Sequence, residues 1–327
     1  MKTADKGKKS VCETWQLGIQ SQNAISDENP AEGFALLSRA GFSGVDFSLH
    51  GYLLNLDIYQ GRLNDFFDPD VEEMKAFFAP HKEGARKAGI RFGQMHMPYP
   101  IYVPTGSREV NDYLRQQVAP KSMEICAFLE CPYIVIHGFK LARLLGSEEA
   151  EWLYTESFIH ELAPMAKEMG ITICIENLYE SIGGHIVEGP CCKAQRCAER
   201  IDRINDRYGA EVLGFCFDTG HANLVGIDFE EFISRLGHRL KVLDIHDNDA
   251  VQDLHQIPFT FTRTRENKAS TDWEGFLRGL RAIHYEGILN FETGPVLKSF
   301  PEALKEDALR MIAGIGRYFA RELERDV

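Results

Sequence analysis

Six β-rich runs of this sequence end in a side chain that can bind a metal ion or move a proton. These terminal residues are His96, His137, Glu176, Asp218, His246 and Glu292. If the runs are parallel strands of one barrel, their carboxyl ends meet at one mouth of the fold. Six polar side chains in one cleft need partners, because a buried charge is tolerated only when it is paired or bound to a metal. The pattern therefore predicts a divalent metal site.

The donor types narrow the choice of metal. Glu176, Asp218, His246 and Glu292 offer three carboxylates and one imidazole. This mixed set suits Mn²⁺, Mg²⁺, Co²⁺ or Zn²⁺ and disfavours metals that seek thiolates. Any one of these residues alone is more often a packing or capping residue, but six at the same structural position argue against coincidence.

Further polar residues extend the predicted cluster. His221 follows Asp218 by three positions in FDTGHAN, where a turn entering a helix places both side chains towards one site. Asp253 and His255 form a D-x-H pair that projects to one side if the stretch is extended, although a solvated loop pair is the alternative. The other histidines are expected to be surface or packing residues: His50, His81, His160, His185, His238 and His284.

The arrangement of the apolar runs predicts the fold. Eight β-rich runs alternate with segments long enough for helices, at residues 15–20, 44–48, 90–96, 133–137, 171–176, 212–218, 240–246 and 287–292. This alternation indicates a parallel sheet, and the first turn lacks the G-x-G-x-x-G of a doubly wound sheet. Amphipathic segments at 70–88, 147–169 and 229–236 end at Gly89, Gly170 and Gly237, a common helix stop.

We therefore predict one α/β domain over residues 1–327, a single (β/α)8 TIM barrel that ends in a closing helix at 300–325. Residues 1–13 are expected to be flexible. Three long connections, at 49–69, 178–197 and 248–271, follow strands on the face where barrel enzymes keep their active sites. In the third, Arg263, Arg265 and Lys268 are either a site for a substrate phosphate or carboxylate or a solvated basic loop.

Composition restricts the function classes. The chain of 327 residues has 36 Lys and Arg against 49 Asp and Glu, a formal charge of −13, which disfavours nucleic acid and anionic membranes as partners. No signal-peptide core and no run of roughly 20 apolar residues follows the basic amino terminus, so we expect a cytoplasmic protein. The 8 cysteines contain no C-x-x-C pair and are expected to be buried, reduced thiols.

The segments QMHMPY, VIHG, CIENL, CFDTGHAN, DIHDND with DLH, and NFETG occur in this order between residues 94 and 294. As a set they resemble the xylose-isomerase-like TIM-barrel superfamily, which includes sugar isomerases and epimerases and the abasic-site endonucleases of the three-zinc type. The resemblance implies a metal quartet of Glu176, Asp218, His246 and Glu292. It also implies that the two glutamates act as acid and base on opposite faces of the substrate, and that His221 contacts the sugar.

The resulting expectation is a metal-dependent isomerase or epimerase that moves a proton next to the carbonyl of a ketose or keto-sugar. Glu176, Glu292 and His137 are the predicted catalytic residues, and His96, His221, Asp253 and His255 the predicted substrate-binding residues. One divalent ion is expected, Mn²⁺ before Mg²⁺, Co²⁺ or Zn²⁺. The expected partners are a small sugar and further copies of the chain.

Three alternatives stay open. The nine metal ligands of the endonucleases all have counterparts here, although the charge is acidic and QIPFTFTRTRENKASTDW replaces a glycine-rich segment after His255. The resemblance extends to the barrel subunit of C-glycoside deglycosidases, which eliminate an aglycone from a 3-oxo-glycoside and work with a small β-rich partner subunit; His137 would then be the base. A non-catalytic binding barrel would be expected to lose quartet residues, and none is lost.

Overall fold

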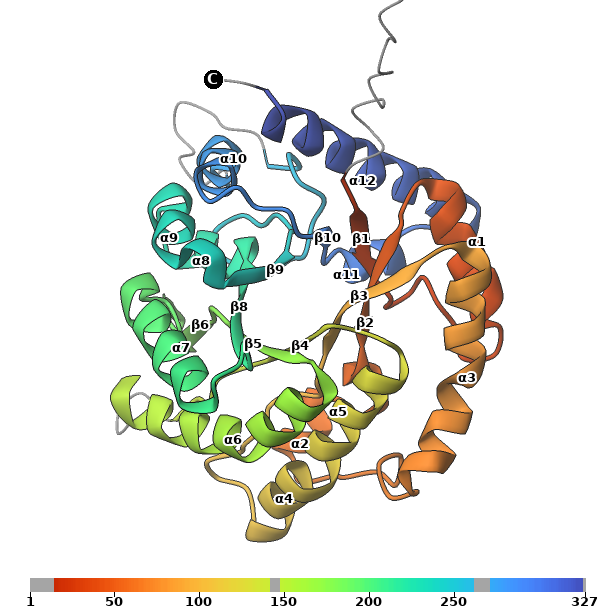
Figure 1. The fold of residues 1–327 in the computed structure, drawn as a ribbon. Helices are drawn as coiled ribbons and strands as arrows, with labels where there is room; N and C mark the ends of the chain where they lie inside the picture. Colours follow the sequence, from red (N-terminus) through yellow and green to blue (C-terminus); the bar gives the residue numbers. More distant parts are fainter. Residues whose placement is uncertain (1–14, 142–147, 262–270, 326–327) are drawn as a thin grey trace, which may run out of the picture.

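Eight parallel strands form a barrel in a computed structural model that describes residues 15–141, 148–261 and 271–325 (Figure 1). Their order is β10-β1-β2-β3-β4-β5-β8-β9. The strands are β1 (Leu17–Gln20), β2 (Gly44–Ser48), β3 (Arg91–His96), β4 (Tyr133–Ile136), β5 (Thr172–Glu176), β8 (Leu213–Asp218), β9 (Leu240–Asp244) and β10 (Leu289–Phe291). A parallel bridge between Ile245 and Phe291 brings the two ends of the sheet together. The predicted fold class is confirmed.

Each of the eight predicted runs contains one barrel strand. Three of the six predicted strand ends agree with the structure, in which β3, β5 and β8 end at His96, Glu176 and Asp218. His137 and Glu292 come directly after their strands, and His246 lies two residues beyond β9. All six residues therefore lie at the carboxyl end of the barrel.

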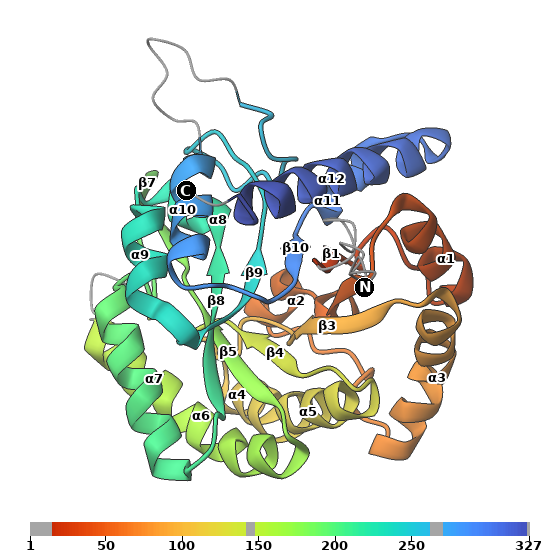
Figure 2. The same cartoon turned by 45° about the horizontal axis from the view of Figure 1, so that its top comes forward.

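Helices surround the barrel, and the last of them packs on its outside beside β1, between α10 and α1 (Figure 2). The main ones are α1 (Pro30–Ala40), α3 (Val71–Ala88), α4 (Arg108–Tyr113), α5 (Ala119–Phe128), α6 (Glu148–Met169), α7 (Ala194–Tyr208), α9 (Phe229–Leu236), α10 (Trp273–Ala282) and α12 (Glu302–Leu323). Shorter helices are α2 (Asn55–Tyr59), α8 (Thr219–Leu224), α11 (Gly294–Ser299), η2 (Leu49–Tyr52), η3 (Leu114–Val118) and η4 (Gly237–Arg239). The predicted closing helix is α12.

The helix boundaries follow from local chemistry. Asp70 caps α3 by accepting a hydrogen bond of 2.9 Å from the backbone N–H of Glu73. Gly89 ends the same helix with φ of +70°, a left-handed conformation that glycine adopts without strain. Three glutamates in the first turn of α6 and two in the first turn of α9 likewise lie at the positive helix ends.

Replacing Asp70 by alanine is expected to lower the free energy of unfolding by about 1 kcal/mol, because the N–H of Glu73 loses its acceptor. Urea-induced unfolding followed by circular dichroism measures the change. Asp70→Asn is the matched control, since an asparagine oxygen accepts the same bond. Equal stability of Asp70→Ala and the wild type would contradict the capping role.

The barrel interior explains the cysteines. Cys174 and Cys216 lie on neighbouring strands and pack with Val135 and Val242 inside the barrel. The seven cysteines in the described residues are all buried and free, as expected. Since these strands are covered on both faces, they read as continuous apolar runs in the sequence.

The three long connections all leave the carboxyl ends of strands. The first contains η2 and α2, and the second carries an antiparallel hairpin of β6 (Tyr179–Ile182) and β7 (His185–Glu188). In the third, Arg263, Arg265 and Lys268 lie outside the described residues, as does the segment 1–13 that was predicted to be flexible. Among the described helices, none is both long and apolar enough to cross a membrane.

Candidate active site at the carboxyl end of the barrel

A polar cavity of about 200 Å³ opens at the carboxyl ends of the strands. Its walls include six predicted site residues: His137, Glu176, His221, Asp253, His255 and Glu292. All three long connections contribute to it, through Asn55 and Tyr59, through Leu178 and Tyr179, and through Asp253 and His255. The predicted position of the site and of its loops agrees with this cavity.

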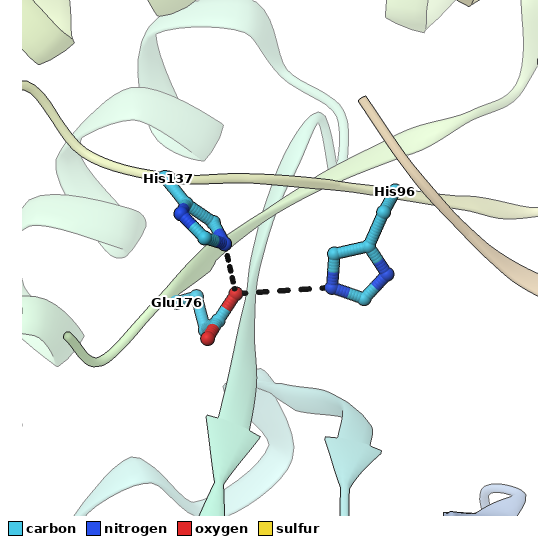
Figure 3. Close-up of side chains that lie close together, drawn as sticks. All are labelled: His96, His137 and Glu176. Carbon is cyan, nitrogen blue, oxygen red and sulfur yellow. Dashed lines mark ion pairs between the residues drawn. The ribbon is translucent and has the colours of Figure 1, made fainter. Parts of the chain in front are cut away.

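Glu176 is the centre of the cluster (Figure 3). Its Oε2 lies 3.0 Å from Nε2 of His137 and 3.8 Å from Nε2 of His96. Its Oε1 lies 2.8 Å from Nδ1 of His221. Although burial alone would raise the pKa of Glu176, these imidazoles, with His137 first among them, hold it well below the usual range. The group is therefore a carboxylate.

Asp218 and His221 are placed by one turn of chain. Asp218 ends β8 and caps α8, because its Oδ1 accepts a 2.5 Å hydrogen bond from the backbone N–H of His221. The three-residue spacing brings Nδ1 of His221 to 3.6 Å from the same oxygen. On its other side, Nε2 of His221 lies 3.3 Å from Oδ2 of Asp253. The predicted pairing is therefore present.

His246 is fully buried and faces Asp218. Its Nε2 lies 3.0 Å and 3.1 Å from the two carboxylate oxygens of Asp218. Its ring stacks on that of His255, with centroids 4.1 Å apart. Gly220 makes room for it, because a Cβ built on Gly220 would lie 1.9 Å from Cε1 of His246.

Glu292 comes directly after β10 and lines the cavity. Its Oε1 accepts a 2.7 Å hydrogen bond from Nε2 of Gln20, and its Oε2 lies 3.4 Å from Nδ1 of His255. Burial raises the pKa of Glu292 well above the usual range, against the lowering effect of His255. The two glutamates therefore differ, since the pKa of Glu176 is lowered and that of Glu292 is raised. Such divergent pairs are typical of an acid and a base in one site.

Asp253 and His255 lie together, but by a different route from the one predicted. Oδ2 of Asp253 is 3.2 Å from Nε2 of His255. The stretch is not an extended strand, because His255 has φ of +48°. A turn of the backbone, rather than strand alternation, brings both side chains to the cavity.

A chain of contacts connects all nine residues singled out in the sequence. Each member lies within 3.9 Å of another through side-chain nitrogen and oxygen atoms. They are His96, His137, Glu176, Asp218, His221, His246, Asp253, His255 and Glu292. The sequence therefore placed in one cluster residues that lie up to about 200 positions apart along the chain.

The donor atoms fit a divalent cation. Two groups of three, Glu176, Asp218 and His221, and His246, Asp253 and His255, have donor atoms within 4.8 Å of one another. Within the described residues, Oε2 of Glu176 and Oδ1 of Asp253 are buried and accept no hydrogen bond of normal geometry, although Nε2 of His137 lies 3.0 Å from Oε2 of Glu176. Buried carboxylate oxygens of this kind need a counterion or a donor.

A family model for the xylose isomerase-like TIM barrel matches residues 34–314 of the chain. The chain belongs to this family. An uncharacterized protein, y4fM, from Sinorhizobium fredii is 25% identical over 189 residues, which are 56% of this chain and 55% of the relative. The chain thus matches about half the length of that relative.

Solved structures share the fold of this xylose isomerase-like barrel. A D-psicose 3-epimerase determined in the presence of D-fructose superposes with a TM-score of 0.66 at 14% identity, over 93% of this chain and 99% of that chain. The 3-keto-D-glucoside 4-epimerase of E. coli gives a TM-score of 0.62 at 14% identity, with the same coverage of 93% and 99%. At these identities the likeness concerns the fold.

His96 has different partners from those expected of a substrate ligand. Its Nδ1 lies 2.9 Å from Oδ1 of Asp46, and its Nε2 lies 3.3 Å from Oδ2 of Asp244. Burial lowers the pKa of His96, but Asp46 and Asp244 raise it well above its usual value. His96 does not line the cavity. Both imidazole nitrogens of His96 therefore face carboxylates, Nδ1 that of Asp46 and Nε2 those of Asp244 and Glu176.

Several site residues were missed by the sequence reasoning. Asp46 and Asp244 are fully buried acids within apolar strands, and Gln94 donates a 2.7 Å hydrogen bond to Asp244. Gln20 is a further polar strand end, at β1. The signal was present in GVDFS and KVLDIH, where one acidic residue interrupts an apolar run.

Proposed function

We propose that this chain is a divalent-metal-dependent epimerase or isomerase that moves a proton next to the carbonyl of a ketose or keto-sugar. One observation carries the proposal: Glu176 and Glu292 enter the same small cavity from strands that stand three places apart around the barrel. A ketose bound between them presents one face to each carboxyl group. The sugar 3-epimerases and the 3-keto-D-glucoside 4-epimerase with the same fold support this choice.

The residues at the cavity have three proposed roles: proton transfer, sugar binding and metal binding. Glu176, kept as a carboxylate by its imidazole neighbours, removes a proton from the carbon next to the carbonyl, and Glu292 delivers one on the other face. His221, Asp253 and His255 line the cavity and supply polar atoms for the sugar hydroxyl groups. Glu176, Asp218, His246 and Glu292 would hold the metal ion, which supplies Lewis-acid polarisation of the carbonyl group and so acidifies the neighbouring C–H.

The proposal is tested with D-psicose, D-tagatose, D-fructose and L-ribulose as substrates. The purified protein is expected to interconvert a ketose with its epimer or isomer, to lose this activity after treatment with a chelator, and to regain it with Mn²⁺ or another divalent ion. Elemental analysis should find one ion per chain. A protein that binds no divalent ion and converts no ketose or keto-glycoside would refute the proposal.

Elimination from a 3-oxo-glycoside is the second candidate, because His137 lines the cavity with its Nε2 3.0 Å from Glu176. Burial lowers the pKa of His137, against the raising effect of Glu176, which favours a neutral imidazole able to accept a proton. Release of an aglycone from an oxidised C-glycoside, together with co-purification of a small partner, would favour this lyase activity over the epimerase activity.

Cleavage of abasic-site DNA with three ions per chain would indicate the endonuclease. The formal charge of −13 opposes it, because DNA binding needs a basic surface. A duplex with a single abasic site, incubated with the metal-loaded protein, is the appropriate substrate. Absence of nicking is the expected result.

A further inference from the structure

Three aromatic rings form a stack at one wall of the cavity. The ring of Tyr99 lies on that of His137, with centroids 4.1 Å apart and 20° between the planes. On its other side it lies on His50, at 4.3 Å and 11°. Tyr99 also lines the cavity. The three residues come from the chain just beyond β2, β3 and β4, so the stack joins three neighbouring strand ends.

His137 depends on this stack for its orientation. Its only polar contacts among the described residues are made by Nε2, which lies 3.0 Å from Oε2 of Glu176. One contact at one nitrogen leaves the imidazole free to turn about its side-chain bonds. The face of Tyr99 restricts that turning, because an imidazole stacked at 4.1 Å cannot rotate its plane without losing the contact or striking the ring.

The ring of Tyr99, rather than its hydroxyl group, makes the contacts. No hydrogen bond to the hydroxyl occurs in the described part of the chain, whereas both ring faces are covered by imidazoles. His50 was expected to be a surface or packing residue, and it packs, but against a ring at the site. Its own Nδ1 is buried without a hydrogen-bond partner among the described residues. His50 therefore packs with its ring face against Tyr99 and supports the stack.

We propose that Tyr99 is a positioning residue that sets the plane of the His137 imidazole, and through it the contact of His137 with Glu176. As far as turnover is concerned, this inference rests on the proposed function. The stack also connects η2, which contains His50, to the residue that touches Glu176. The loop after β2 thereby acts on the catalytic carboxylate without contacting it.

The test compares Tyr99→Phe with Tyr99→Leu. Phenylalanine keeps the stacking ring, and leucine keeps an apolar side chain without a flat face. Tyr102→Leu is the matched control, because Tyr102 stacks on Phe139 at 5.1 Å in the same loop and not on His137. Circular dichroism and thermal melting verify that each variant is folded.

The first readout needs no substrate. Long-range ¹H–¹⁵N NMR spectra report the tautomer of each histidine, and the His137→Gln variant assigns the signal of His137. The wild type, Tyr99→Phe and Tyr102→Leu are expected to show one dominant tautomer, with the proton on Nε2, the nitrogen that lies 3.0 Å from Oε2 of Glu176. Tyr99→Leu is expected to show a mixture of both tautomers. An unchanged His137 signal in Tyr99→Leu, or the same mixture in Tyr99→Phe, would overturn the proposal.

The second readout is turnover of whichever ketose the wild type converts. Tyr99→Leu is expected to lower kcat by about tenfold or more, since misplacement of a group at a reacting centre by about 1 Å can cost 10²-fold. Tyr99→Phe and Tyr102→Leu are expected to stay within about twofold of the wild type, the scale of a change that leaves the geometry intact. Wild-type kcat in Tyr99→Leu would overturn the proposal. If the wild type converts no ketose, the proposed function fails, and the NMR result still decides the role of Tyr99.

Discussion

Replacing Glu176 by glutamine is expected to reduce kcat/KM by about 10²- to 10⁴-fold, the usual contribution of a positioned acid or base. Glu176 is only 1% exposed and lies within 3.8 Å of three imidazoles. Glutamine keeps the shape and one oxygen, but it has no negative charge and accepts no proton at neutral pH. Metal affinity is expected to fall as well, because a neutral amide is a weaker ligand for a hard divalent ion.

Glu292→Gln separates the two proposed roles. Glutamine at position 292 still accepts the hydrogen bond from Gln20, which is 2.7 Å long in the wild type. Epimerisation should be lost, but Glu176 should still remove the proton from the epimer whose C–H faces it. In deuterium oxide this variant is therefore expected to exchange that proton for deuterium without inversion. Glu176→Gln should do so only from the opposite epimer.

Mass spectrometry and NMR of the recovered sugar measure the exchange. Glu188→Gln on β7 is the control, because Glu188 is an exposed carboxylate at the same end of the barrel and its ion pair is with Lys193. Full epimerisation by both variants would refute the two-carboxylate assignment. If the metal-loaded variants exchange the proton of neither epimer for deuterium, the base is another residue, and His137 is the first to examine.

The fold was predictable because its periodicity is local. Each barrel strand reads as an apolar run, and the stops at Gly89, Gly170 and Gly237 all have positive φ in the structure. The predicted strands were too long by one or two residues at several ends, such as His246 beyond β9. Apolar composition continues past the last ladder hydrogen bond, so composition alone cannot fix that boundary.

The candidate site was predictable to the extent that it follows strand ends. Topology brings those ends together whatever the loops do, which is why nine distant residues could be grouped. The buried acidic residues that contact His96 were not predictable in the same way. Asp46 lies in the middle of β2 and Asp244 is the last residue of β9, and only the packed barrel reveals that both face His96. The stack on Tyr99 also depends on the exact path of three loops, which residue types do not encode locally.

Replacing Gly220 by alanine is expected to lower turnover by about 10²-fold, the scale of a roughly 1 Å displacement at a reacting centre. The new Cβ would lie 1.9 Å from Cε1 and 2.5 Å from each ring nitrogen of His246, which is fully buried. The backbone cannot easily move away, because Asn248 donates a 2.9 Å hydrogen bond to the Gly220 carbonyl oxygen. The imidazole must therefore leave its place opposite Asp218, and metal affinity should fall with it.

Helix propensity alone predicts that Gly220→Ala stabilises the protein, since alanine is favoured over glycine inside a helix by about 1 kcal/mol. Gly314→Ala in α12 is the matched control, because its nearest atom would be Nη2 of Arg317 at an ordinary 3.7 Å. That variant should melt at or above the wild-type temperature with unchanged turnover. Isothermal titration with Mn²⁺ and a ketose assay compare the two variants. Wild-type metal affinity and turnover in Gly220→Ala would show that His246 does not need this position, and would remove it from the proposed ligand set.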